Sequence, residues 1–390
     1  MNVNWNKIRK EQFPALENSI YLKAAGGSPM SKAGYDASLK YLNGLYMVGD
    51  LFWDQYLDDI EFTRQLIADY INCKPHEVAF LINTSSGMNV IAHILEKGRI
   101  IYPEGEFPTS ILIFKKLGFG CDKFPLEFDN TYPLDKISNY IKEDTKYVIH
   151  SHVQYLTGFK QNLGVLGNFC KKNKYISIIN ATQSFGAFPI DTTQEKIDIL
   201  VASGLKWACS GYGLGILYFN DRLIPREGLS FLSWLSVKDS YSMDNDNLNF
   251  INQTKTMDGL GGTPNFASIF ALKANLLLIK EIGNGNIREG IKQIQKRIIN
   301  LTQNFIEQLK ETSFKIITPL DIEYRSGIIT LESENAESIF SDLSAKNIQF
   351  SLRNYPKTKK KTLLRFAFNY YNNEDDIEET ISILKLNQKR

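Results

Sequence analysis

Cysteine is scarce in this sequence. The four cysteines, Cys73, Cys121, Cys170 and Cys209, lie far apart, and no two of them form a C-x-x-C pair. This spacing suggests neither a zinc site nor a disulfide framework, so we expect no bound metal. Because disulfides are rare in reducing compartments, the sequence predicts a cytoplasmic protein.

Long apolar runs and an excess of one charge are also missing. No apolar run reaches the roughly 18 residues of a membrane span, and residues 1–5 lack the basic-then-apolar pattern of a secretory signal. The sequence has 45 basic and 43 acidic residues, which gives a net charge of +2. Nucleic-acid-binding proteins usually concentrate positive charge. We therefore expect neither a membrane nor a nucleic acid as a partner.

The 390 residues exceed the usual length of one domain, which predicts two domains. In the first part, short β-rich apolar runs alternate with helical patterns, including helices at 88–96 and 163–172. The expected buried strands cover residues 78–82, 99–102, 147–153, 175–179, 199–202 and 215–219. This alternation predicts a mostly parallel sheet covered by helices.

The pattern changes after residue 266. Two long helices are expected at 269–282 and 287–309, separated by a Gly-Asn-Gly-Asn turn. Strands at 326–331 and 362–368 and a final helix at 374–386 follow. This part predicts a smaller α+β domain. We place the large domain at 15–270 and the small domain at 271–390, with residues 1–14 as an N-terminal arm that packs on it.

The most informative residue is Lys206, in the segment ASGLKW directly after the expected strand 199–202. Lysine is rarely buried, and the ends of strands in α/β sheets are where ligands bind. A lysine desolvated at such a place loses its proton and can attack a carbonyl carbon. A lysine that extends from a strand end into water is an alternative which this segment alone leaves open.

Two further polar segments follow expected strands. Residues 180–184 (NATQS) bring amide groups to the same edge of the sheet, and residues 83–89 (NTSSGMN) join a strand to a helix. Hydroxyls and free N–H groups at a helix start suit a phosphate. An ordinary helix cap is the alternative for residues 83–89.

Together, these segments resemble ordered motifs of the class V aminotransferase and cysteine desulfurase family of pyridoxal 5′-phosphate (PLP) enzymes, which includes kynureninase-like and isopenicillin-N-epimerase-like proteins. The resemblance covers residues 15 to 386. The motifs that carry it are YLKAAGG (21–27), TSSGMN (84–89), EFPT (106–109), the segment 151–158, SGLK (203–206), GTP (262–264) and LRF (364–366).

This resemblance implies the PLP-dependent aspartate-aminotransferase type fold, an α/β large domain with a mostly parallel mixed sheet and a small C-terminal α+β domain. It also implies PLP as cofactor, a small-molecule amino-acid substrate, and a homodimer whose subunits share the active site.

The resemblance also assigns roles to single residues. Lys206 should form the Schiff base with PLP and later move the proton at the substrate Cα. The other residues expected around the cofactor are Thr84, Ser85 and Ser203 at the phosphate, Thr263 reaching the phosphate from the partner chain, Phe107 stacked on the ring, Asn180 at the pyridine nitrogen and Gln183 at the phenolic oxygen. Arg365 should bind the substrate carboxylate, with Arg353 as a weaker candidate.

Three departures from the family pattern stand out. Asn180 occupies the place of an aspartate that pairs with the protonated pyridine nitrogen, and a neutral amide would not hold that proton by charge. The expected result is a weaker electron sink, although an amide can also serve as an ordinary hydrogen-bond partner. Leu205 replaces a histidine, so one phosphate contact is expected to be missing. Residues 353–361 lack the desulfurase cysteine, so we expect no persulfide chemistry.

Three functions compete on this evidence. The predicted function is a PLP-dependent aminotransferase. The first alternative is a C–S (β-elimination) lyase or an epimerase-like enzyme, and Asn180 favours elimination over transamination. The second alternative is a non-catalytic protein that uses the fold for binding. The presence of both Lys206 and Arg365 counts against this last function.

Overall fold

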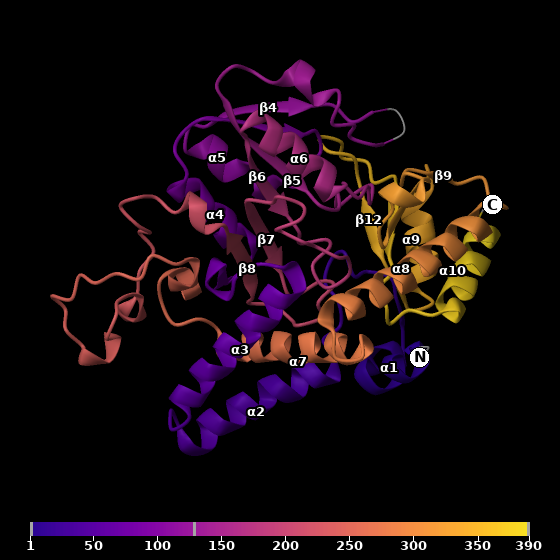
Figure 1. Ribbon diagram of the computed structural model, residues 1–390. Helices are drawn as coiled ribbons and strands as arrows, with labels where there is room; N and C mark the ends of the chain where they lie inside the picture. Colours follow the sequence, from indigo (N-terminus) through magenta and orange to yellow (C-terminus); the bar gives the residue numbers. More distant parts are fainter. Residues whose placement is uncertain (1–2, 128–129, 388–390) are drawn as a thin grey trace.

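The computed structural model of the protein describes residues 3–127 and 130–387. Its largest element is a seven-stranded sheet with the strand order β2-β8-β7-β6-β5-β3-β4 (Figure 1). Its strands are β2 (Val78–Leu81), β3 (Arg99–Pro103), β4 (Gly120–Phe124), β5 (Thr145–Ser151), β6 (Ile176–Asn180), β7 (Ile199–Ser203) and β8 (Gly215–Phe219). Strands β4, β3, β5, β6 and β7 are parallel, whereas β8 runs antiparallel to both of its neighbours. The predicted mixed, mostly parallel sheet is therefore confirmed.

Both faces of this sheet are buried, because alternate residues of each strand enter two different apolar clusters. On β7, Leu200 packs with one cluster and Val201 with the other. The first face is covered by α3 (Trp53–Ile71), α6 (Leu163–Asn173) and α7 (Phe266–Ile282), and the second by α4 (Thr84–Ile94) and α5 (Leu112–Lys116). Burial on both faces explains why the central strands read as continuous apolar runs.

Asparagine side chains start several of the helices. Asn83, Asn162, Asn265 and Asn286 each accept a hydrogen bond from a first-turn N–H, at the N-termini of α4, α6, α7 and α8 (Ile287–Leu309). An asparagine oxygen at this position satisfies a donor that the helix itself leaves unpaired. Helix α2 (Lys32–Val48) begins in the same way with Ser31.

A second, antiparallel sheet lies toward the C-terminus, with the strand order β12-β13-β10-β9. Its strands are β9 (Lys315–Ile316), β10 (Ile328–Glu332), β12 (Ser351–Arg353) and β13 (Leu363–Ala367). A separate apolar cluster joins this sheet to α8, α9 (Ala336–Ser344) and α10 (Glu374–Asn387). This small α+β part agrees with the fold expected from the sequence.

The N-terminal segment packs against the C-terminal part of the chain. In α1 (Trp5–Gln12), Arg9 forms an ion pair with Asp376 at 2.8 Å. Strand β1 (Ile20–Tyr21) pairs in parallel with β11 (Ile348–Gln349). The predicted boundary between residues 270 and 271 falls inside helix α7, and the division into two domains stays a prediction. Within the described residues, no helix has the length and apolar character to span a membrane.

Gly158 lies where the large sheet meets the small one. Its φ is +76°, and a Cβ at this position would lie 2.4 Å from the carbonyl oxygen of Ile328 at the start of β10. That carbonyl belongs to a strand of the small sheet, so the contact has little room to adjust.

We predict that Gly158→Ala lowers the free energy of unfolding by about 1–3 kcal/mol, because it adds both backbone strain and a backbone clash. Gly164→Ala, in the first turn of α6, is the matched control, since a Cβ there would make only an ordinary 3.4 Å contact with Asn162. Chemical denaturation of both variants tests this prediction. An equal loss in the two would contradict the proposed clash.

Candidate active site

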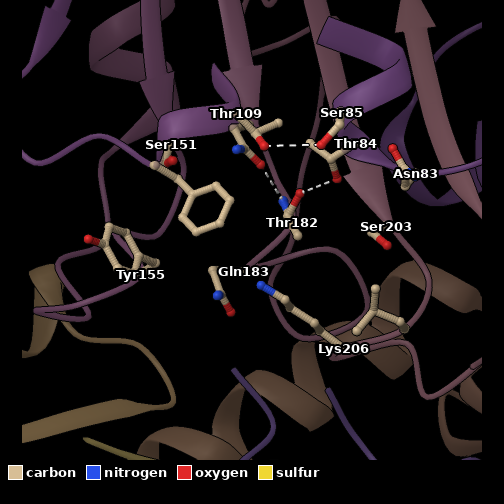
Figure 2. Close-up of a pocket in the computed structure, with 13 residues that line it drawn as sticks. Asn83, Thr84, Ser85, Thr109, Ser151, Tyr155, Thr182, Gln183, Ser203 and Lys206 are labelled. Carbon is tan, nitrogen blue, oxygen red and sulfur yellow. Dashed lines mark hydrogen bonds between the residues drawn. The ribbon is translucent and has the colours of Figure 1, made fainter. Parts of the chain in front are cut away.

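A cavity of about 190 Å³ lies at the carboxyl ends of β5, β6 and β7 and the start of α4 (Figure 2). The strand register explains why polar residues meet there, since Ser151 at the end of β5 lies opposite Asn180 at the end of β6. The residues that line the cavity are Asn83, Thr84, Ser85, Phe107, Thr109, Ser151, Tyr155, Asn180, Thr182, Gln183, Ser203, Leu205 and Lys206.

Lys206 reaches into this cavity from the loop that follows β7, toward Thr182 and Gln183 (Figure 2). Burial, together with the nearby cations Arg365 and Arg353, lowers the pKa of Lys206 to about 7. Among the described residues, no carboxylate forms an ion pair with its amine. A large fraction of Lys206 is therefore uncharged at neutral pH, which is the state in which an amine acts as a nucleophile.

Hydroxyl groups gather at one end of the cavity, at the N-terminus of α4. The Oγ atoms of Thr84 and Thr182 lie 2.7 Å apart, and those of Ser85 and Thr109 lie 3.0 Å apart. The first N–H groups of an α-helix have no acceptor within the helix and carry the positive end of its dipole. This end of the cavity therefore suits an anion such as a phosphate.

Two amide side chains are held in fixed orientations. The N–H of Thr182 can only donate, so the Asn180 atom 3.0 Å from it is the oxygen, and the Asn180 nitrogen donates to Ser110 Oγ at 3.0 Å. In the same way, the indole N–H of Trp207 donates to the Gln183 oxygen at 2.9 Å. Both amides therefore present defined atoms to the cavity.

Phe107 and Tyr155 are the aromatic residues that line the cavity. The Phe107 ring meets that of Tyr155 edge-on, with centroids 5.2 Å apart, and its centroid lies 5.9 Å from Lys206 Nζ. A flat ring bound between Lys206 and Phe107 would have an aromatic face to pack against. The stacking role expected for Phe107 stays a prediction.

Three of the expected site residues do not line the cavity. Arg365 is buried on β13 and donates to the carbonyl oxygen of Tyr155 at 2.6 Å. Burial lowers the pKa of Arg365 to about 9, with Arg353 adding to the effect. Within the described part of the chain, no carboxylate forms an ion pair with either arginine. Thr263 is exposed and lies outside the cavity.

The motif search missed Thr109, Ser151, Tyr155 and Thr182 as lining residues. His150 and His152, the neighbours of Ser151, do not line the cavity. Burial lowers the pKa of His150 to about 4 and of His152 to about 3, so both are neutral core residues. Successive side chains of a strand point to opposite faces of the sheet, so Ser151 lies on the face opposite to His150. That alternation could have identified Ser151 from the sequence.

None of the four cysteines lines the cavity. Cys170 and Cys209 are fully buried, and burial raises the pKa of Cys209 to about 12. Burial also raises the pKa of Cys73 and Cys121. A thiol needs a lowered pKa to act as a nucleophile, so their environments agree with the expected lack of persulfide chemistry, which stays a prediction.

We predict that the reactivity of Lys206 changes with pH around its lowered pKa. In protein freed of bound small molecules, acetylation of Lys206 should rise with a midpoint near pH 7, because the amine is protonated below that value. Competitive labelling followed by mass spectrometry measures this midpoint against a lysine peptide, whose pKa is about 10.4. A midpoint above about pH 9 would show that burial does not discharge the amine.

Comparisons with known proteins agree with this fold and site. A sequence model of the family described as "Aminotransferase class-V" matches residues 20–379, which confirms the resemblance inferred from the motifs. A relative named "Uncharacterized aminotransferase YcbU", from Bacillus subtilis, is 22% identical over 375 residues, which cover 95% of each chain.

Two solved structures show the same fold. The apo structure of the cysteine desulfurase of Thermococcus onnurineus superimposes with a TM-score of 0.85 at 20% identity, covering 100% of this chain and 99% of that one. The cystine C–S lyase C-DES, in complex with its product cysteine persulfide, has a TM-score of 0.81 at 18% identity and covers 96% of this chain and 99% of its own.

Proposed function

We propose that this chain, which belongs to the aminotransferase class-V family, is a PLP-dependent aminotransferase that acts on an amino acid. The observation that carries the proposal is Lys206, a half-buried lysine whose pKa is lowered to about 7 and which shares one cavity with a helix N-terminus that suits an anion. Members of the family use PLP, and the residues of this cavity match the chemistry of that cofactor.

The cavity has a suitable group for each part of PLP. When bound, PLP supplies an aldehyde that amines can attack and a ring that accepts electrons from the substrate. The hydroxyls of Thr84, Ser85 and Ser203 would hold the phosphate beside the start of α4. Lys206 would attach the cofactor and afterwards move the proton at the substrate Cα.

The aromatic and amide groups would orient the ring. Phe107 would pack on one face of the ring, while Asn180 would lie at the pyridine nitrogen and Gln183 at the phenolic oxygen. Both amides are already held by hydrogen bonds to the protein. Such fixed donors and acceptors orient a ligand without paying an ordering cost on binding.

The substrate carboxylate would bind at Arg365. A buried guanidinium without a carboxylate partner is costly, and an incoming carboxylate would relieve that cost through two parallel hydrogen bonds. Arg353 lies close enough to lower the pKa of Arg365 and adds positive charge to the same region. Arg353 is the weaker candidate; within the described residues its guanidinium donates only to the carbonyl of Leu352, at 3.3 Å.

We also propose that two copies of the chain share the site. Thr263 is exposed and lies outside its own cavity, as expected of a residue that reaches the partner's phosphate. Large apolar side chains are exposed at the end of α2 and just after it, including Tyr46, Met47 and Leu51. An exposed apolar surface of this kind is typical of an interface between subunits.

A C–S lyase is the second candidate function. Asn180 favours it, because a neutral amide at the ring nitrogen makes a weaker electron sink than the carboxylate usual in the family. An epimerase-like activity is kept within the same alternative. A purely binding role is disfavoured by the discharged amine of Lys206, which a binding protein would not need.

A half-reaction with a panel of amino acids tests the proposed function. The protein loaded with PLP should convert the cofactor to pyridoxamine phosphate with its amino donor, as measured by mass spectrometry of the released cofactor. Lys206→Ala should not catalyse this conversion. Release of pyruvate or a related keto acid with PLP unchanged would replace the aminotransferase by a lyase. Exchange of the Cα proton without either product would indicate an epimerase-like enzyme, and absence of all three reactions would support a binding protein.

Substitution of Arg365 tests the carboxylate site separately. Arg365→Ala should weaken amino-acid binding by about 1.5–3 kcal/mol, the contribution of a charge-assisted hydrogen bond, while PLP binding stays close to wild type. Arg365→Lys should recover only part of the loss, because a lysine lacks the forked geometry. Spectroscopic titration with the amino acid and with PLP gives both affinities. Unchanged substrate affinity in both variants would place the carboxylate elsewhere.

A further inference from the structure

Glu106 is a buried carboxylate in the turn that follows β3, hydrogen-bonded to Phe107 and Ser151, two residues that line the cavity. It accepts four hydrogen bonds. The N–H groups of Phe107 and Ser151 donate to it at 2.8 Å each, and the hydroxyls of Ser110 and Ser151 donate at 3.1 and 2.5 Å. In the described part of the chain no cation forms an ion pair with it, so hydrogen-bond donors alone hold its charge.

The same hydrogen bonds connect Glu106 to Asn180. Because the Asn180 oxygen accepts the N–H of Thr182, the Asn180 nitrogen must donate to Ser110 Oγ. Ser110 Oγ is thereby an acceptor, and its own hydrogen points to Glu106 Oε1. All the donors run in one direction, from the amide at the cavity through one hydroxyl to the buried carboxylate.

We propose that Glu106 is a positioning residue that supplies, through Ser110 and Asn180, the negative charge at the nitrogen end of the cofactor ring. This inference rests on the proposed function, because it requires PLP in the cavity. The substitution of Asn180 for the family aspartate then moves the carboxylate two hydrogen bonds back from the ring and does not remove it.

The physical effect is polarisation along the chain of hydrogen bonds. A hydroxyl that donates to a carboxylate becomes a better acceptor, so it draws more strongly on the Asn180 N–H and makes the Asn180 oxygen more negative. A more negative oxygen near the ring nitrogen favours the protonated ring. Burial raises the pKa of Glu106, and its hydrogen bonds offset only part of that rise. Both N–H donors match the ionised form.

The alternative is that Glu106 only braces the turn, since it also holds the N–H of Phe107. Activity alone does not separate the two roles, because a loosened turn would lower it as well. The protonation state of the ring nitrogen does separate them. It responds to charge, whereas a change of packing that keeps the ring in place would leave it unmoved.

The test uses PLP labelled with nitrogen-15, bound to the full-length protein, with the nitrogen resonance followed against pH. Glu106→Gln should lower the apparent pKa of the ring nitrogen by about one unit, a tenfold change in its protonation equilibrium. Ser110→Ala interrupts the relay without touching the carboxylate and should shift the pKa in the same direction. Asn180→Asp, which brings an anion to the ring itself, should shift it the opposite way.

Ser184→Ala is the matched control. Ser184 is as fully buried as Ser110, but its hydroxyl donates to the carbonyl oxygen of Ala181 and not to a carboxylate. The resonance of this variant should stay at the wild-type position. If Glu106→Gln does not fold, as judged by circular dichroism, the comparison of Ser110→Ala with Ser184→Ala decides the matter.

The outcomes also separate this inference from the proposed function. If the wild-type protein does not hold PLP on Lys206, the proposed function itself is wrong. If PLP is held there, but Glu106→Gln and Ser110→Ala leave the resonance at the wild-type position, the relay is overturned. A shift in Ser184→Ala equal to that in Ser110→Ala would also overturn it, because general loosening would then explain both.

Discussion

The site depends on the burial of one amine that has no counter-ion. A charged lysine in an apolar interior costs several kcal/mol, and the usual remedies are a partner carboxylate or loss of the proton. Lys206 has no such partner among the described residues, and its lowered pKa favours loss of the proton. The structure must therefore hold its side chain in place by other means.

The residues beside Lys206 supply that support. Trp207 is fully buried, and its indole N–H donates to Gln183. Gly204 lies so close to Ser210 that a Cβ there would come within 2.1 Å of the serine oxygen, which keeps the turn after β7 tight. A half-buried lysine between a tight turn and an anchored tryptophan has a restricted choice of conformations. The same support delivers its amine to the cavity.

Charge is unevenly distributed around this amine. Arg365 and Arg353 raise the positive potential on the side where the substrate is proposed to bind, and both lower the pKa of Lys206. Glu106 places a negative charge on the other side, behind Asn180. An amino acid entering this field would find its carboxylate attracted at one end and the electron-accepting ring supported at the other. That arrangement favours chemistry at Cα. With Glu106 behind it, Asn180 favours elimination over transamination less strongly.

Much of the fold was predictable from the sequence, for physical reasons. Strands buried on both faces must be apolar throughout, so six of the seven strands of the large sheet stood out. Strand β4 did not, because its sequence Gly-Cys-Asp-Lys-Phe is largely polar and only Phe124 in it is fully buried. Helix α2 gave no clear pattern either, since apolar residues such as Leu42 and Tyr46 lie on its exposed side.

The candidate site was predictable only where a motif marked it. Residues at strand ends, such as Asn180 and Lys206, follow from the alternation of strands and helices. Glu106 does not, because a sequence does not reveal whether a glutamate is buried or which donors surround it. The same limit applies to Arg365, whose separation from the cavity depends on how the two sheets pack.

The most direct test of the whole account is to find the lysine that holds the cofactor. The protein incubated with PLP and then reduced with borohydride should carry the phosphopyridoxyl group on Lys206, as located by peptide mapping with mass spectrometry. An adduct on a different lysine, or none at all in a folded protein, would contradict the assignment of this cavity as the active site.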